Sequence, residues 1–192
     1  ENQKVTALNL LRSLQENKMP ASKIFDAIKL GKFLAITRIW QAERGLLFAD
    51  INFYFNPVTC LLEPIGFDGN PKLSKESPYC YFSHGDIKDN WVNFALSDPS
   101  IAKNYIHFLY EFSQKSYWEN LKSEFNGMEK KLRHLLYREL FNKSPARIWK
   151  NYLNLITYDP WNIIESRTSA IRDELSETQI IRVLGKPSEH EG

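Results

Sequence analysis

Apolar residues recur at helical spacing through most of the chain, and only one stretch breaks this rhythm. Between residues 4 and 17 apolar side chains return every three positions, which predicts a short amphipathic helix. The apolar arc over residues 23 to 42 is too wide for a surface helix, so we expect a buried, central helix there. Ser22 is placed to cap this helix, Asp26 lies in its opening turns, and Arg44-Gly45 is expected to end it.

The exceptional stretch runs from Asp50 to Asn70 and predicts a β-hairpin over residues 52 to 67. Two apolar runs, of which the first is Phe53-Tyr54-Phe55, flank the turn residues Asn56-Pro57-Val58-Thr59. Cys60 stands where a hairpin turn often has glycine. The second run contains a proline, which indicates an edge strand or a bulge because proline cannot donate to a ladder.

Polar residues lie at both open ends of this hairpin. Asp50 and Asn52 precede the first strand, and Asp68-Gly69 follows the second. Because an antiparallel pair brings its two open ends together, we expect Asp50, Asn52 and Asp68 to lie near one another. Carboxylate and amide oxygens suit a magnesium ion shared with a phosphate, with Asp68 as the principal ligand because Gly69 lets the backbone turn. The alternative is a surface hairpin with ordinary Asp and Asn caps.

Helix signals return after the hairpin. Residues 69 to 90 are rich in helix breakers and predict a long loop, and residues 91 to 96 predict a short helix. Asp98-Pro99 is a strong helix start, for a helix that runs to about Gln114. Ser116-Tyr117-Trp118-Glu119 has the form of a capping box that opens a helix reaching Phe141.

The C-terminal third predicts further helices. Ser144-Pro145 starts a helix through Ile156, and Asp159-Pro160 starts another from Trp161 to about Leu175. Residues 178 to 184 are expected to form a short strand, and the polar residues from Gly185 onward are expected to be disordered. The basic run from Lys130 to His134 is either a solvated helix face or a phosphate-binding patch.

Composition narrows the class of protein. A chain of 192 residues is long enough for one domain, with or without a small appendage, and for a core that needs no disulfides. The net charge of +2 argues against duplex DNA as a partner, and no apolar run approaches the roughly 20 residues of a membrane helix. Cys60 and Cys80 either pair or remain free thiols, and no Cys/His cluster has zinc spacing.

One family pattern is recognisable in this chain. Lys29 to Ala42, followed by Asn-Phe-Tyr-Phe-Asn-Pro-Val-Thr and Glu-Pro-Ile-Gly-Phe-Asp, resembles the catalytic core of the CotH kinase family, atypical bacterial protein kinases of the spore-coat type. The resemblance continues through Asp98-Pro99 to Ile164-Glu165-Ser166-Arg167, over most of residues 24 to 175. It implies a mainly α-helical α+β domain, built like a kinase C-lobe with one β-hairpin, over residues 21 to 184. Residues 1 to 20 would be an N-terminal helix or a linker from a missing upstream lobe, and residues 185 to 192 a tail.

The resemblance also implies a function and a set of site residues. It implies binding of Mg²⁺ and ATP and transfer of phosphate to a protein acceptor, with Asn52 and Asp68 as metal and cofactor ligands. Arg44 would neutralise phosphate charge. Asp50 is either a third ligand or a substitute catalytic base, and Glu43 is the fallback base.

Two departures from the kinase pattern favour a different function. The catalytic aspartate of kinases lies five residues before the metal-binding asparagine, and Leu47 occupies that position here. No glycine-rich phosphate loop and no Val-Ala-Ile-Lys-like strand precede residue 24. The competing hypothesis is therefore a catalytically inactive scaffold or protein-interaction domain that keeps the kinase-like hairpin.

Overall fold

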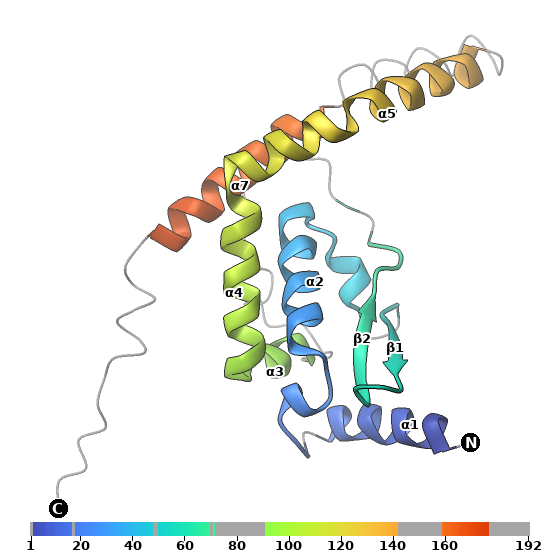
Figure 1. Ribbon diagram of the computed structural model, residues 1–192, viewed down its shortest axis with the longest axis vertical. Coiled ribbons are helices and arrows are strands. Elements are labelled where there is room, and N and C mark those ends of the chain that lie inside the picture. Colours follow the sequence, from blue (N-terminus) through green and yellow to red (C-terminus); the bar gives the residue numbers. More distant parts are fainter. Residues whose placement is uncertain are drawn as a thin grey trace, which may run out of the picture.

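The fold of the chain is α+β and mainly α-helical, as the sequence predicts. The computed structural model describes residues 2–16, 18–47, 50–69, 71, 91–141 and 159–176. Within these residues it contains six α-helices, two short 3₁₀ helices and one antiparallel hairpin (Figure 1). In chain order they are α1 (Asn2–Gln15), 3₁₀ (Ala21–Lys23), α2 (Ala27–Trp40), 3₁₀ (Glu43–Leu46), β1 (Asn52–Asn56), β2 (Leu61–Ile65), α3 (Trp91–Ser97), α4 (Pro99–Ser113), α5 (Lys115–Phe141) and α7 (Pro160–Ser176).

Helix α2 is the centre of the fold. It lies between the hairpin on one side and α4 on the other (Figure 1). The side chains of Leu30, Leu34 and Ile39 are fully buried, as the wide apolar arc predicts. On the hairpin side the ring of Phe25 packs against Phe53 with their centroids 5.2 Å apart. The expectation that the central helix packs under the hairpin, with later helices on its other side, is confirmed.

Both ends of the central helix differ from the sequence prediction. Asp26 is itself the N-cap of α2, and its Oδ1 accepts hydrogen bonds from the backbone N–H groups of Ile28 and Lys29. Ser22 is not the cap, because it lies in the 3₁₀ helix Ala21–Lys23, and Phe25 then forms a β-bridge with Leu62 before α2 begins. At the other end Gln41 adopts the left-handed conformation with φ 50° and stops the helix, well before the predicted Arg44-Gly45.

The predicted hairpin turn is present. The side chain of Asn56 organises it, since Oδ1 accepts a hydrogen bond from the Val58 N–H at 2.9 Å, and the Cys60 N–H donates to the Asn56 carbonyl. Cys60 has φ 55°, in the left-handed region, which explains why glycine is common at this position. Cys60 is exposed, and the question of its pairing with Cys80 lies outside the described residues.

Helices α2 and α4 cross in close contact at Gly31. A β-carbon built on Gly31 would lie 2.7 Å from both the Asn104 Cβ and the Tyr105 backbone nitrogen. Contacts below 3.0 Å do not occur between real atoms of this kind, and the Tyr105 nitrogen is part of a helix that cannot yield locally. Glycine is therefore required at this crossing for steric reasons.

Replacing Gly31 with alanine is expected to lower the free energy of unfolding by about 1 to 2 kcal/mol, because the added methyl group forces the two helices apart. Gly127 provides the matched control, since it also lies inside a helix but has nothing within 4 Å of the position that a β-carbon would take. Gly127→Ala should raise the unfolding free energy by about 0.5 to 1 kcal/mol. Urea denaturation of both variants measures the difference, and equal effects would contradict the steric explanation of Gly31.

The Asp-Pro helix starts are both confirmed. Asp98 caps α4, with its Oδ1 accepting from the Ser100 N–H at 3.0 Å and Pro99 in the first turn. Asp159 does the same for α7 through the Trp161 N–H. The capping-box prediction at Ser116 is wrong, because α5 already begins at Lys115 and places Ser116 inside the helix.

Two buried arginines join α2 to the later helices. Arg38 donates from Nη1 to the Tyr105 hydroxyl on α4, and its Nη2 lies 2.5 Å from the Glu174 carboxylate on α7. Arg167, which is 1% exposed, donates to the Ile39 carbonyl and to the Gln41 Oε1 at the C-terminal end of α2. Cations at that end of a helix are favourable because of its dipole.

Several predicted elements lie outside the described residues. These are the loop after Pro71, the helix over residues 144 to 156, the strand over residues 178 to 184 and the tail from Gly185. Among the helices that the structure does describe, none combines the length and the apolar character needed to cross a membrane.

Candidate functional site

The open end of the hairpin is formed by the register of its two strands. Asn52 pairs with Ile65, so the segment from Gly66 to Asp68 leaves the hairpin where Asn52 enters it. The predicted antiparallel pairing is therefore confirmed, and the closeness of Asp50, Asn52 and Asp68 stays a prediction. Asn52 is exposed, and its Nδ2 donates a hydrogen bond to the Asp50 carbonyl at 3.1 Å. This bond fixes the amide and leaves its Oδ1 as an exposed acceptor.

Asp68 forms an ion pair with Arg44. The Arg44 Nε lies 3.2 Å from the Asp68 Oδ2, and both side chains are exposed. Asp68 itself has φ 42°, a left-handed conformation that aspartate tolerates better than most residues. The sequence prediction gave the turning role to Gly69, and that prediction is wrong, since no described glycine has a positive φ.

Two glycines instead let the chain around Arg44 lie close to the chain around Asp68, so that the ion pair can form. A β-carbon on Gly45 would lie 2.9 Å from the Phe67 carbonyl oxygen, and one on Gly69 would lie 3.1 Å from the Ala42 Cβ. The 3₁₀ helix at Glu43–Leu46 therefore packs directly against the segment that carries Asp68. This packing puts the Arg44 guanidinium beside the Asp68 carboxylate.

The two candidate bases lie on the same connection between α2 and β1. Glu43 opens the 3₁₀ helix and is half-buried. Asp50 is half-buried as well, and its N–H donates to the Leu47 carbonyl at 2.9 Å. The structure thus links Asp50 to Asn52 through the Asn52 amide and Asp68 to Arg44 through an ion pair, but records no direct contact between Asp50 and Asp68.

The metal-site prediction is left open by this arrangement. Across the described part of the chain, no group of three or more His, Cys, Asp or Glu side chains is placed to hold a metal ion. The predicted site has two carboxylates, Asp50 and Asp68, and one amide, Asn52. A set with fewer than three such side chains is not tested by this finding, so the metal site stays a prediction.

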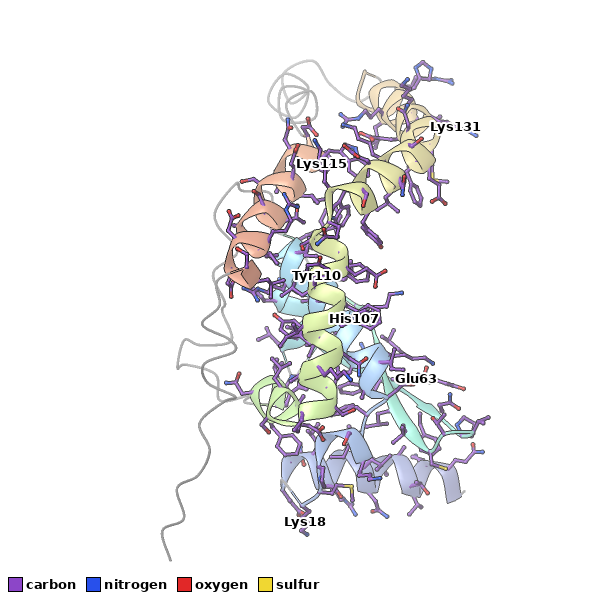
Figure 2. All side chains as sticks on the ribbon, turned by 60° about the vertical axis from the view of Figure 1, so that its left-hand side comes forward. Lys18, Glu63, His107, Tyr110, Lys115 and Lys131 are labelled. Atoms are coloured by element: carbon purple, nitrogen blue, oxygen red, sulfur yellow. The ribbon has the colours of Figure 1, made fainter. Side chains whose placement is uncertain are left out.

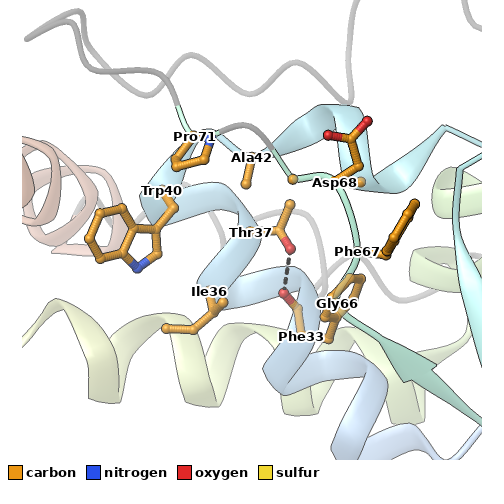
Figure 3. A pocket seen from close by; sticks show the side chains of 11 residues that line it. Phe33, Ile36, Thr37, Trp40, Ala42, Gly66, Phe67, Asp68 and Pro71 are labelled. Atoms are coloured by element: carbon orange, nitrogen blue, oxygen red, sulfur yellow. Dashed lines mark hydrogen bonds between the residues drawn. The ribbon is translucent and has the colours of Figure 1, made fainter. Parts of the chain in front are cut away.

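A pocket of about 280 Å³ lies beside Asp68. One wall is the apolar face of α2, with Phe33, Ile36 and Trp40, and the other is the chain from Gly66 to Gly69 (Figure 3). Figure 3 shows Asp68 at the rim, with its carboxylate directed away from Phe33 and Ile36. The Thr37 hydroxyl donates to the Phe33 carbonyl at 2.8 Å, so this polar group of the lining is already satisfied. The pocket offers apolar contact, with charge at its rim.

A second carboxylate of the hairpin, Glu63, is engaged elsewhere. Its Oε2 lies 2.6 Å from the Lys29 ammonium, and its Oε1 accepts from the Asn56 amide at 2.7 Å. The hydrogen bond from Lys29, and after it the one from Asn56, hold the pKa of Glu63 below its ordinary value. Glu63 is therefore part of a surface contact in the middle of the hairpin, separate from the open end.

A buried arginine that the sequence prediction did not include supports this region. Arg167 donates hydrogen bonds to the Ile39 carbonyl and the Gln41 side chain. These two residues lie immediately before the connection that carries Arg44. A signal for it exists, because Arg167 falls on the apolar stripe of its helix between Ile163 and Ile171, where a charged residue has to find buried partners.

The assignment of a function rests on these residues alone. No family model matches the chain, and comparisons with curated proteins and with solved structures found no match.

Proposed function

We propose that this chain is a CotH-type, kinase-like domain that binds Mg-ATP at the open end of the hairpin and transfers phosphate to a protein acceptor. The proposed metal ligands are Asn52 and Asp68, with Arg44 beside them to neutralise phosphate charge. The observation that carries the proposal is the pairing of Asn52 with Ile65, because it brings the Asn52 side and the Asp68 side of the hairpin to one end.

Each of the two proposed ligands has a side-chain oxygen that could bind Mg²⁺. The Asn52 amide uses its Nδ2 in the bond to the Asp50 carbonyl, so its oxygen remains for a cation. Asp68 uses Oδ2 in the ion pair with Arg44, and Oδ1 accepts no hydrogen bond from the described residues. When bound, Mg²⁺ supplies positive charge for the phosphate oxygens. Asp50 is the proposed acceptor of the proton from the substrate hydroxyl, and Glu43 is the fallback.

A protein-binding domain without catalytic activity is the second candidate, and Leu47 is the observation that favours it. In the resemblance Leu47 stands at the position of the catalytic aspartate, and its side chain is exposed and cannot accept a proton. Such a domain would keep the hairpin and its ion pair for their structural value.

Calorimetric titration of Mg-ATP into the full chain tests the proposal. Wild type should bind, and Asp68→Asn should weaken binding at least about tenfold, because the amide keeps the size of the side chain and tolerates the left-handed backbone while removing the charge. Glu63→Gln is the matched control, since it neutralises another carboxylate of the same hairpin and should leave binding unchanged.

Wild type that binds no nucleotide, or an Asp68→Asn variant that binds as well as wild type, would overturn the metal-site assignment. Where binding depends on Asp68, transfer of labelled phosphate to a casein-like acceptor separates the two candidates. Transfer that is lost in Asp50→Asn supports a kinase with Asp50 as base. Binding without transfer supports the inactive domain.

A further inference from the structure

Helix α5 carries an exposed apolar face beyond the body of the molecule. It has 27 residues and is therefore about 40 Å long, and only its first turns pack against α4 and the core (Figure 1). Further along, Phe125, Met128, Leu132 and Leu135 are between 40% and 57% exposed. Exposed apolar side chains gathered on one face mark an interaction site more often than isolated ones do.

These residues follow a heptad pattern. Leu121, Phe125, Met128, Leu132 and Leu135 are spaced alternately by four and three residues, which is the spacing of the d and a positions of a coiled coil. The pattern forms one continuous apolar seam along the helix.

One flank of this seam is occupied by α7. The Trp161 Nε1 donates to the Glu129 carboxylate at 2.9 Å, and the Lys122 ammonium lies 6.0 Å from the centre of the Trp161 ring. The opposite flank carries Glu124 and Lys131, which are both exposed (Figure 2 labels Lys131). These two residues are one heptad apart, at g positions, where charges select the partner helix and its orientation.

We propose that the seam of α5 binds the same seam of a second copy of this chain, with the two helices antiparallel. In this register Leu121 packs against Leu132 of the partner subunit, and Phe125 packs against Met128 of the partner subunit. Glu124 then faces Lys131 of the partner subunit, and two-fold symmetry repeats every contact. The interface has four apolar layers and two ion pairs on its free flank.

The charges favour this register over its neighbours. If one helix slides by one heptad in one direction, Glu124 faces Glu124 of the partner subunit. If it slides by one heptad in the other direction, Lys131 faces Lys131 of the partner subunit. A parallel pair would bring Glu124 against Glu129 of the partner subunit. Each alternative sets like charges together, which is unfavourable.

The shape of the chain also favours the antiparallel arrangement. The body containing α2 and α4 lies at the N-terminal end of α5, and the helix extends away from it (Figure 1). Antiparallel helices place the two bodies at opposite ends of the pair.

A charge swap tests the pairing. The mass of the full chain is measured by sedimentation velocity over a wide range of concentrations. Wild type should form a dimer. Glu124→Lys and Lys131→Glu should each raise the dimer dissociation constant at least about tenfold, because each replaces two attractive pairs by two repulsive ones. The double variant should recover most of the wild-type affinity, since it restores both pairs in reversed order.

Lys130→Glu is the matched control, because it makes the same change of charge one residue away, on the side of α5 that faces away from the seam. Circular dichroism confirms that each variant keeps its helices. A monomeric wild type would overturn the proposal and assign the face to another occupant, either residues 142 to 158 of the same chain or a different protein. A dimer that responds equally to Lys130→Glu and Lys131→Glu, or is not recovered by the double variant, would overturn it as well.

Discussion

Replacing Arg167 with methionine is expected to lower the free energy of unfolding by about 3 kcal/mol. Methionine keeps most of the apolar volume, but the Ile39 carbonyl and the Gln41 Oε1 lose a buried donor, and each unsatisfied buried acceptor costs about 1 to 3 kcal/mol. The loss also removes a positive charge from the C-terminal end of α2, where the helix dipole favours it.

Urea denaturation followed by circular dichroism measures this loss. Arg12→Met is the control, since Arg12 is exposed on α1 and its replacement should change the unfolding free energy by less than about 0.5 kcal/mol. Equal effects of the two substitutions would show that the buried contacts of Arg167 contribute nothing beyond a surface arginine. A large effect of Arg167→Met alone supports its role in joining α7 to the end of α2.

Replacing Asp98 with alanine is expected to cost about 2.5 to 4 kcal/mol of stability. Asp98 caps α4 through Ser100, and its Oδ2 also accepts a hydrogen bond from the Ser22 N–H at 2.8 Å. The capping interaction is worth about 1 kcal/mol, and the bond from Ser22 to a buried charged group is worth about 1.5 to 3 kcal/mol in similar cases. The same side chain thus starts one helix and anchors the chain that leads into another.

This contribution should depend on pH in a definite direction. Burial alone would raise the pKa of Asp98, but hydrogen bonds from Ser22, Ser100 and Ile101 outweigh it and hold the pKa below its ordinary value. A lowered pKa stabilises the folded chain above the unfolded-state pKa of about 4, and this stability is lost as the pH falls through the folded-state pKa. The difference in unfolding free energy between wild type and Asp98→Asn should therefore be constant near neutral pH and shrink below about pH 4.

Asp159→Asn is the control for the cap itself. Asp159 also caps a helix, but among the described residues its second oxygen accepts only from the Asn162 side chain, which can turn to suit an amide. Asn is as good a cap as Asp, so this variant should lose much less stability than Asp98→Asn. A loss of equal size in the two variants would mean that the Ser22 contact adds nothing to the cap.

Local signals predicted most of the fold. The Asp-Pro pairs located the starts of α4 and α7 to within a residue, because an N-cap and a proline act on the backbone beside them. The hairpin was also predicted correctly, since its turn chemistry lies within a few residues. These features depend on residues within a few positions of one another, so they can be read from the sequence.

Features that depend on distant residues were missed. Ser22 looked like a cap, but its N–H donates to Asp98, 76 residues away, and Phe25 is held in a β-bridge to Leu62. The buried partners of Arg167 lie on another helix. At the site, the hairpin followed from the sequence, while the contact between Arg44 and Asp68 needed the 3₁₀ helix to pack against the chain after β2. Such contacts cannot be deduced from spacing.

The residues that lead into α2, from Ile24 to Asp26, affect how easily the hairpin beside the site can unfold. The Leu62 N–H donates to the Ile24 carbonyl and the Asp26 N–H donates to the Leu62 carbonyl. Strand β2 is therefore hydrogen-bonded on both of its edges, although the sheet within the described residues has two strands. An isolated two-stranded hairpin is marginal in water, whereas this one shares its central strand with the chain that enters the buried helix. Local unfolding of the hairpin then has to break contacts with the core. The strand that leads to Asp68 therefore belongs to the same cooperative unit as α2, whereas the exposed turn around Cys60 can fray on its own.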